Sequence, residues 1–285
     1  MPAKLGVLVI HGIGPHDENF AEPMKEALIR RISSNDGICW KPVCWATLLL
    51  REESKLLDKL FPKGKHPHWF FKWFLRFKLR ELVMNGIGDV AAYRSVLNIS
   101  GHMSHSRQTN TIYDDIHDRV HKRIVMLREE LGNADKPLIV IAHSLGSVIM
   151  YDYIWDRQQH INEKLYGATP FERMETLTGL ITFGSPIPLF TFGYHREVSI
   201  KFPPDNLHKD FKGKAKWFNF YDADDVFGWP VKDLKDCVAE NKPISVGSIF
   251  TRWNILCHGK YWTDNNFTKP VAKYISEILK LCPET

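Results

Sequence analysis

Long apolar runs are missing from this 285-residue sequence. Crossing a bilayer takes about 20 consecutive apolar residues, and no stretch comes close to that length. The first apolar stretch, residues 5–10, is followed at once by the polar segment 11–18, so it does not have the form of a secretory signal. We therefore expect no membrane-spanning helix and a cytoplasmic location.

Cysteines are few, and their spacing indicates neither a metal site nor a disulfide framework. The five cysteines are odd in number and include no C-x-x-C pair, which is typical of reduced thiols. His117 and His121 stand four residues apart, but the acidic residue of an H-E-x-x-H motif is missing, and we interpret them as surface histidines. We expect no metal and no other cofactor.

A large excess of one charge is also absent, since the net charge is only +5. Lys and Arg are spread along the chain and do not gather in a nucleic-acid-binding motif, so we expect no nucleic-acid partner. With 44% hydrophobic residues the chain can bury one large core, and α/β folds of this size are often single domains. We expect residues 1–285 to form one domain.

Strand-like and helix-like spacings of apolar residues alternate along the chain. This alternation predicts an α/β fold with a mostly parallel central sheet that is flanked by helices on both faces. The expected strands are residues 5–10, 38–45, 138–142, 180–183, 216–221 and 249–256. The expected helices are residues 21–32, 112–131, 147–155 and 271–281.

The segment Ala142-His143-Ser144-Leu145-Gly146 stands between an expected strand and an expected helix. A strand that delivers a serine onto a sharp turn into a helix is the arrangement of a nucleophile elbow. Small residues are needed two positions before and after Ser144, because larger side chains would collide with the helix or the neighbouring strand. Ser144 is thus the candidate nucleophile, and the alternative is a serine that only caps a helix.

A second motif, His11-Gly12-Ile13-Gly14, follows the first expected strand. Acyl transfer needs backbone N–H groups aimed at the developing oxyanion, and glycine lets a loop approach the nucleophile closely. We assign these donors to the N–H groups of Ile13, with Gly14 second, and of Leu145 at the start of the helix after Ser144. The alternative is that the His-Gly pair forms a turn that merely ends the strand.

His258 is the candidate general base. It follows an apolar run at 253–256 and precedes the expected helix at 271–281, which places it on a loop at a strand end. Neutral imidazole can take the proton of the serine and return it to the leaving group. His143 competes because it adjoins Ser144, but we expect its side chain to point away from Ser144 and to pack behind the turn.

Three aspartates, Asp222, Asp224 and Asp225, follow the strand expected at 216–221. A carboxylate at this point would hold His258 in one tautomer and stabilise its imidazolium form. An acid followed by one variable residue and then two apolar ones fits Asp224 best, with Asp225 second and Asp222 third. The alternative is an aspartate-rich turn that caps the next helix.

The chain order Ser144, Asp224, His258 resembles that of lipase- or esterase-type α/β-hydrolases. The resemblance implies an α/β-hydrolase fold, here shortened at its N-terminal edge because the sequence begins on the strand that leads to His11. It also implies that Ser185 lies near the site, and that Ala142 is a tolerated variant of the usual glycine. The motifs that carry it are His11-Gly12, residues 142–146, Thr182-Phe183-Gly184-Ser185-Pro186, the aspartate turn and residues 258–262.

Residues 48–110 interrupt the alternation of strands and helices and are too long for an ordinary connection. We expect them to form a helical cap or lid inserted into the domain. Within them, residues 66–80 interleave aromatic side chains with Lys and Arg at four-residue spacing. Such a segment could touch a membrane surface, form a wall of an acyl-chain pocket, or pack on the core as a cap helix.

These patterns together predict a serine hydrolase that cleaves a carboxylic ester through an acyl-enzyme on Ser144. The expected substrate is a small-molecule or lipid ester with an apolar part. Thioesterases, phospholipases and amidases use the same groups, so the sequence does not separate these activities. The alternative is a non-catalytic lipid-binding or scaffolding protein of the same fold that associates with membranes through residues 66–80.

Overall fold

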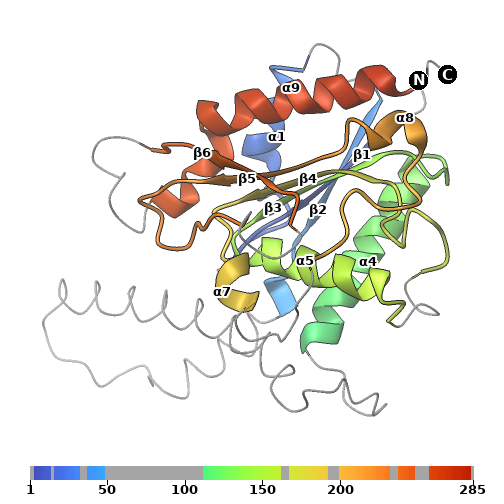
Figure 1. Ribbon diagram of the computed structural model, residues 1–285, viewed down its shortest axis with the longest axis horizontal. Coiled ribbons are helices and arrows are strands. Elements are labelled where there is room, and N and C mark those ends of the chain that lie inside the picture. Colours follow the sequence, from blue (N-terminus) through green and yellow to red (C-terminus); the bar gives the residue numbers. More distant parts are fainter. Residues whose placement is uncertain are drawn as a thin grey trace, which may run out of the picture.

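A computed structural model describes residues 3–13, 16–32, 37–48, 112–161, 167–191, 199–231, 237–247 and 257–283. In this part of the chain six parallel strands form one sheet in the order β2-β1-β3-β4-β5-β6 (Figure 1). The α/β class and the parallel sheet predicted from the sequence are therefore confirmed. The strands are β1 (Leu5–Ile10), β2 (Ile38–Val43), β3 (Leu138–His143), β4 (Leu177–Phe183), β5 (Lys216–Tyr221) and β6 (Glu240–Pro243).

Helices cover both faces of this sheet. Helices α1 and α9 pack together on one face, and α4 and α5 lie on the other (Figure 1). The long helices are α1 (Glu22–Ile29), α4 (Ile112–Glu130), α5 (Leu145–Gln158) and α9 (Asn265–Leu281). The short ones are α7 (Ile187–Thr191), α8 (Lys209–Lys212), η1 (Cys257–Gly259) and η2 (Tyr261–Thr263).

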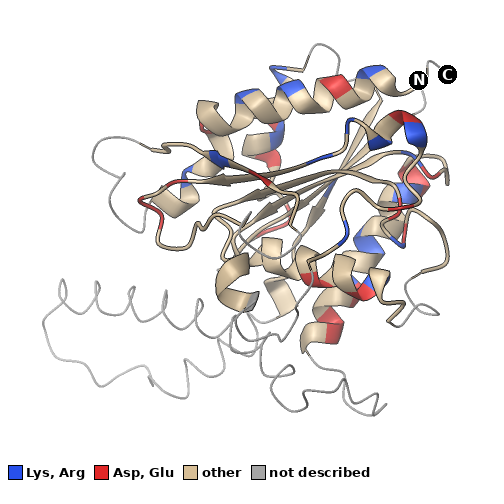
Figure 2. Cartoon of the chain, viewed as in Figure 1, with Lys and Arg blue, Asp and Glu red and all other residues tan. Residues whose placement is uncertain are grey.

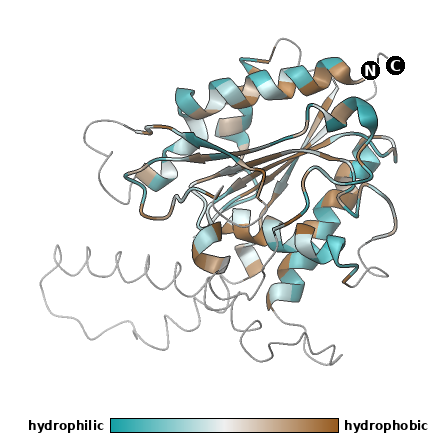
Figure 3. Ribbon diagram, in the orientation of Figure 1, coloured by the Kyte–Doolittle hydropathy of each residue, from teal (hydrophilic) through white to brown (hydrophobic). Residues whose placement is uncertain are grey.

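The central strands β1, β3 and β4 are buried along their whole length and mainly apolar, because both of their faces are covered. Successive side chains of a strand point to opposite faces, so Leu8 and Ile10 of β1 join the core under α4 and α5, whereas Val7 and Val9 join the core under α1 and α9. The strands are accordingly brown in Figure 3. Lys, Arg, Asp and Glu lie mainly on the helices, the loops and the strands at the sheet edges (Figure 2).

Most expected elements occur near their predicted residues, although β4 begins at Leu177 and not at 180, and α9 at Asn265 and not at 271. Helix α5 begins at Leu145 and not at 147, because the chain enters the helix directly from the turn at Ser144. Strand β6 was not expected, since its sequence Glu-Asn-Lys-Pro has no apolar residue. The strand expected at 249–256 and nearly all of the insertion expected at 48–110, including residues 66–80, lie outside the described residues.

The interpretation of His117 as a surface histidine is wrong. Its side chain is buried on α4, and Nδ1 lies 3.3 Å from Oδ2 of Asp156 on α5. The hydroxyl of Tyr113 donates to the same carboxylate oxygen at 2.8 Å. Helix α4 therefore packs a polar stripe as well as an apolar one against its neighbour, which periodicity of apolar residues alone does not reveal.

Candidate active site

Ser144 occupies a strained turn between β3 and α5. Its φ of 51° and ψ of −129° are costly for a residue with a side chain, and such strain persists only where the surroundings fix it. A Cβ at Gly146 would lie 2.3 Å from the carbonyl oxygen of His11, so no other residue fits there. The steric requirement predicted for this position is thus met, and the turn places the Ser144 hydroxyl at the carboxyl edge of the sheet.

The Ser144 hydroxyl is hydrogen bonded to His258. Ser144 Oγ lies 2.8 Å from Nε2 of His258, and Nδ1 of the same ring lies 2.8 Å from Oδ2 and 3.1 Å from Oδ1 of Asp225. A carboxylate only accepts, so Nδ1 carries the proton and Nε2 offers its lone pair to Ser144. Three residues from separate segments of the chain thus form one continuous chain of hydrogen bonds.

The carboxylate of Asp225 is buried and accepts from several donors. The hydroxyl of Tyr261 donates to Oδ2 at 3.0 Å, and the N–H of Phe227 donates to Oδ1 at 3.0 Å. Burial, reinforced by the charge of Asp225, raises the pKa of Tyr261, which keeps this hydroxyl protonated as a donor. A Cβ at Gly228 would lie 2.9 Å from Oδ2 of Asp225, so the loop closes directly over the carboxylate.

The prediction that Asp224 contacts His258 is wrong, because Asp225 occupies that place. Asp224 is exposed, and its N–H donates to Oδ1 of Asp222 at 3.0 Å. Asp222 is buried and also accepts from the N–H of Val246 at 2.7 Å. The N–H of Asp225 closes a turn onto the carbonyl of Asp222, and this turn directs the side chain of Asp225, not that of Asp224, towards His258.

The two candidate oxyanion donors adjoin Ser144. A Cβ at Gly12 would lie 2.5 Å from Cβ and 3.1 Å from Oγ of Ser144, so the loop that carries Ile13 lies against the serine. Leu145 follows the serine as the first residue of α5. Within the described part of the chain, no hydrogen bond uses the N–H of either Ile13 or Leu145. Both groups are therefore available to a ligand oxygen.

Trp45 and His11 hold the loop of Gly12 and Ile13 in place through hydrogen bonds. Sequence reasoning missed this role of Trp45. His11 donates from Nδ1 to the carbonyl of Gly12 at 2.7 Å and accepts at Nε2 from the N–H of Trp45 at 3.2 Å. The indole N–H of Trp45 donates to the carbonyl of His11 at 2.9 Å, and the two rings stack. Burial lowers the pKa of His11 to about 3, so the ring stays neutral and keeps this pairing.

Ser185 lies near the site, as the resemblance implies. Its hydroxyl is 2.7 Å from that of Ser147, which donates to the carbonyl of Ser144 at 2.5 Å. The N–H of Trp229 donates to the carbonyl of Ser185 at 3.0 Å. Ser185 therefore joins the end of β4 both to the turn at Ser144 and to the loop after Asp225, without touching the reactive oxygen.

The Cys257 thiol, next to His258 in the sequence, does not compete with Ser144 as nucleophile. Cys257 is buried in the core under α1 and α9. Burial, with the charges of the nearby aspartates, raises the pKa of its thiol to about 11, so it stays protonated.

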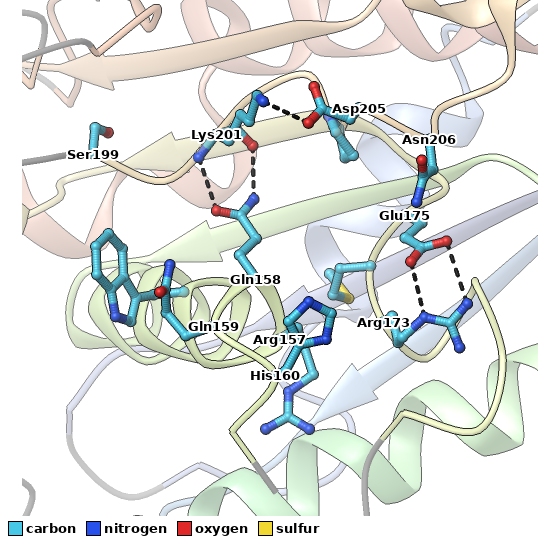
Figure 4. A pocket seen from close by; sticks show the side chains of 13 residues that line it. Arg157, Gln158, Gln159, His160, Arg173, Glu175, Ser199, Lys201, Asp205 and Asn206 are labelled. Carbon is cyan, nitrogen blue, oxygen red and sulfur yellow. Dashed lines mark hydrogen bonds and ion pairs between the residues drawn. The ribbon is translucent and has the colours of Figure 1, made fainter. Parts of the chain in front are cut away.

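A separate cavity of about 540 Å³ lies at the C-terminal end of α5 (Figure 4). Several of its polar side chains are hydrogen bonded or ion paired within the protein. Gln158 exchanges two hydrogen bonds with the main chain of Lys201, and Arg173 forms an ion pair with Glu175 at 2.9 Å. Helix α5 begins at the Ser144 turn and ends at Gln158, so the cavity lies a helix length away from His258. It is therefore not part of the Ser144 site.

The described residues contain no group of three or more His, Cys, Asp or Glu side chains that could hold a metal ion. Among their helices, none is long and apolar enough to span a membrane. No model of a known protein family matches the sequence, and no curated protein matches it.

Proposed function

We propose that this protein is a serine hydrolase of the α/β-hydrolase type that cleaves a carboxylic ester through an acyl-enzyme on Ser144. The observation that carries the proposal is the chain of hydrogen bonds from Asp225 through His258 to Ser144. A nucleophile bonded to a base, which is in turn oriented by a buried acid, is the arrangement that activates a serine.

In the acylation step Ser144 Oγ attacks the ester carbonyl while Nε2 of His258 takes its proton. The buried carboxylate of Asp225 stabilises the imidazolium that forms. The imidazolium then protonates the leaving alkoxide, and the alcohol departs as the carbonyl re-forms on the serine ester. Water attacks this acyl-enzyme with His258 again as base, which releases the carboxylic acid and restores Ser144.

The N–H groups of Ile13 and Leu145 would hold the oxyanion of each tetrahedral intermediate. Both are free of hydrogen bonds to described residues, and both adjoin Ser144. The N-terminus of α5 adds a favourable field for negative charge at the same point. Such donors typically contribute about 100-fold to 1,000-fold each to turnover.

A fluorophosphonate probe tests the proposal directly. We expect stoichiometric phosphonylation of the wild-type chain, with the adduct mapped to Ser144 by peptide mass spectrometry. Hydrolysis of a series of p-nitrophenyl esters should then give an acyl-chain profile. A folded protein that neither reacts with the probe nor cleaves any ester of the series would refute the proposal. If that protein nevertheless bound anionic vesicles, the lipid-binding alternative would replace it.

Exposed apolar side chains at the rim of the site favour an apolar substrate. Val226 is 59% exposed and Trp229 42% exposed, and both lie on the loop that holds Asp225. Phe227 lies between them in the sequence, with its ring 5.0 Å from that of His258. Large exposed apolar groups beside a reactive serine are expected where substrate covers them.

Replacing Val226 and Trp229 together with serine should lower kcat/KM for long-chain esters about tenfold and leave short-chain esters nearly unchanged. Covering roughly 60 Å² of apolar surface at about 25 cal/mol per Å² corresponds to such a factor. Val238→Ser is the matched control. Val238 is 55% exposed but lies just before β6, at the amino ends of the strands, whereas Ser144 lies at their carboxyl ends. Equal losses for both ester lengths would contradict a role in substrate selection.

A further inference from the structure

His143, the last residue of β3, is bonded to the main chain of His258. Its Nε2 lies 3.0 Å from the carbonyl oxygen of His258. A carbonyl oxygen only accepts, so the proton of the neutral His143 ring sits on Nε2. His143, which adjoins the candidate nucleophile Ser144, is therefore hydrogen bonded to the main chain of His258, whose ring bonds to Ser144.

The other ring nitrogen of His143, Nδ1, is buried and has no hydrogen-bond partner among the described residues. Nδ1 packs on Gly12, where an added Cβ would lie only 3.2 Å away. A proton there would create a buried charge without a partner, which costs several kcal/mol.

The surroundings of the ring reinforce its neutrality. The ring of His258 lies at 4.7 Å, that of Phe183 at 4.8 Å and that of Trp262 edge-on at 5.2 Å. Among the described residues no carboxylate is paired with the imidazole. Burial, followed by the nearby charge of His258, places the pKa of His143 well below its usual value. The other titratable groups that face it are His11, His16 and Tyr261, and none supplies a negative charge at neutral pH.

We propose that His143 is a positioning residue, which holds the His258 carbonyl through Nε2–H and stays neutral while His258 takes up the serine proton. The proposal rests on the hydrolase function proposed above and adds a residue to its machinery. His258 sits in a single turn of 3-10 helix, and its carbonyl accepts no other hydrogen bond from the described residues. Without the His143 bond this turn can shift, and Nε2 moves away from Ser144.

The test compares two replacements of His143. His143→Gln keeps a side-chain N–H that can reach the same carbonyl, whereas His143→Phe fills the space without a donor. We expect His143→Phe to lower kcat about 100-fold with KM changed less than twofold, because a misplacement of about 1 Å at a reacting group costs that much. His143→Gln should recover at least tenfold of that loss. Equal kcat values for the two variants, or a wild-type kcat for His143→Phe, would overturn the proposal.

Two further measurements on the wild-type chain do not depend on the folding of a variant. Nitrogen NMR of the labelled histidines should assign His143 to the neutral Nε2–H tautomer throughout pH 6 to 8. The acid limb of the kcat/KM profile should follow uptake of a single proton. Two results would refute the neutrality of His143. One is a second proton in the acid limb of the kcat/KM profile that disappears in His143→Gln, and the other is an imidazolium signal from His143 between pH 6 and 8.

These outcomes separate the inference from the function on which it rests. Absence of probe labelling and of ester hydrolysis in the wild-type chain would refute the hydrolase function. Normal labelling of the wild-type chain, with His143→Phe labelled just as fast, would refute only the role of His143. Melting temperatures of both variants show whether a loss in kcat reflects unfolding instead of misplacement of His258.

Discussion

Ser144→Ala is expected to abolish covalent labelling by a fluorophosphonate and to lower ester turnover by about 10⁴-fold to 10⁶-fold. The hydroxyl of Ser144 is the group that would form the acyl-enzyme, and the alanine methyl group cannot take its place. The Ser144 hydroxyl bonds to His258, whereas the turn itself is fixed by Gly146, by Gly12 and by the main chain. We therefore expect the melting temperature to change little.

Ser276→Ala is the matched control for this substitution. Ser276 lies on α9, where its hydroxyl donates to the carbonyl of Ala272 at 2.9 Å, and it has no contact with the site. Its loss should leave labelling and turnover at wild-type values. Labelling of Ser144→Ala at the wild-type rate would show that the nucleophile is another residue and would remove the basis of the proposed mechanism.

Much of the sheet could be predicted from the sequence because burial on both faces leaves a direct mark. Strands β1 and β5 occur at the predicted residues 5–10 and 216–221, since each contrasts sharply with its polar neighbours. Strand β6 could not be predicted this way. It pairs with β5 through main-chain hydrogen bonds, which any residue type except proline can donate, so its composition carries no signal.

The pairing of Ser144 with His258 could also be predicted, but the choice of Asp225 over Asp224 as the acid could not. The turn at Ser144 imposes a local steric rule on Gly146, and a local rule can be read from neighbouring residues. The choice of Asp225 depends on a turn closed by Asp222 and on a hydroxyl from Tyr261, which lies 36 residues along the chain. Contacts between residues so far apart leave no periodic pattern in the sequence.

The contributions of Trp45 and His143 illustrate the same limit. Neither residue stands out in the sequence, because Trp45 closely follows strand β2 and His143 ends the buried strand β3. Their significance comes from three hydrogen bonds, two from Trp45 to His11 and one from His143 to His258. Apolar patterning predicts which residues are buried, but not which buried polar atoms meet.

Asp225→Asn should lower turnover by about 10⁴-fold without unfolding the chain. The carboxylate now accepts from His258, Tyr261 and the N–H of Phe227. An asparagine side chain has one oxygen for these donors, and its amide turned towards Nδ1 of His258 would favour the tautomer protonated at Nε2. That tautomer cannot take the proton of Ser144, so the loss should appear in kcat and in the rate of labelling.

Asp224→Asn is the matched control, because it makes the same chemical change one residue away on an exposed side chain. It should leave kcat within about twofold of the wild-type value, as expected for a surface position that is not bonded to the reacting groups. Asp222→Asn should act differently again. Asp222 accepts from the N–H groups of Asp224 and Val246, so its replacement should lower the melting temperature. The accompanying loss in kcat should be small. A 10⁴-fold loss in Asp224→Asn with near-normal turnover in Asp225→Asn would mean that the acting enzyme adopts a different turn after β5, with Asp224 bonded to His258.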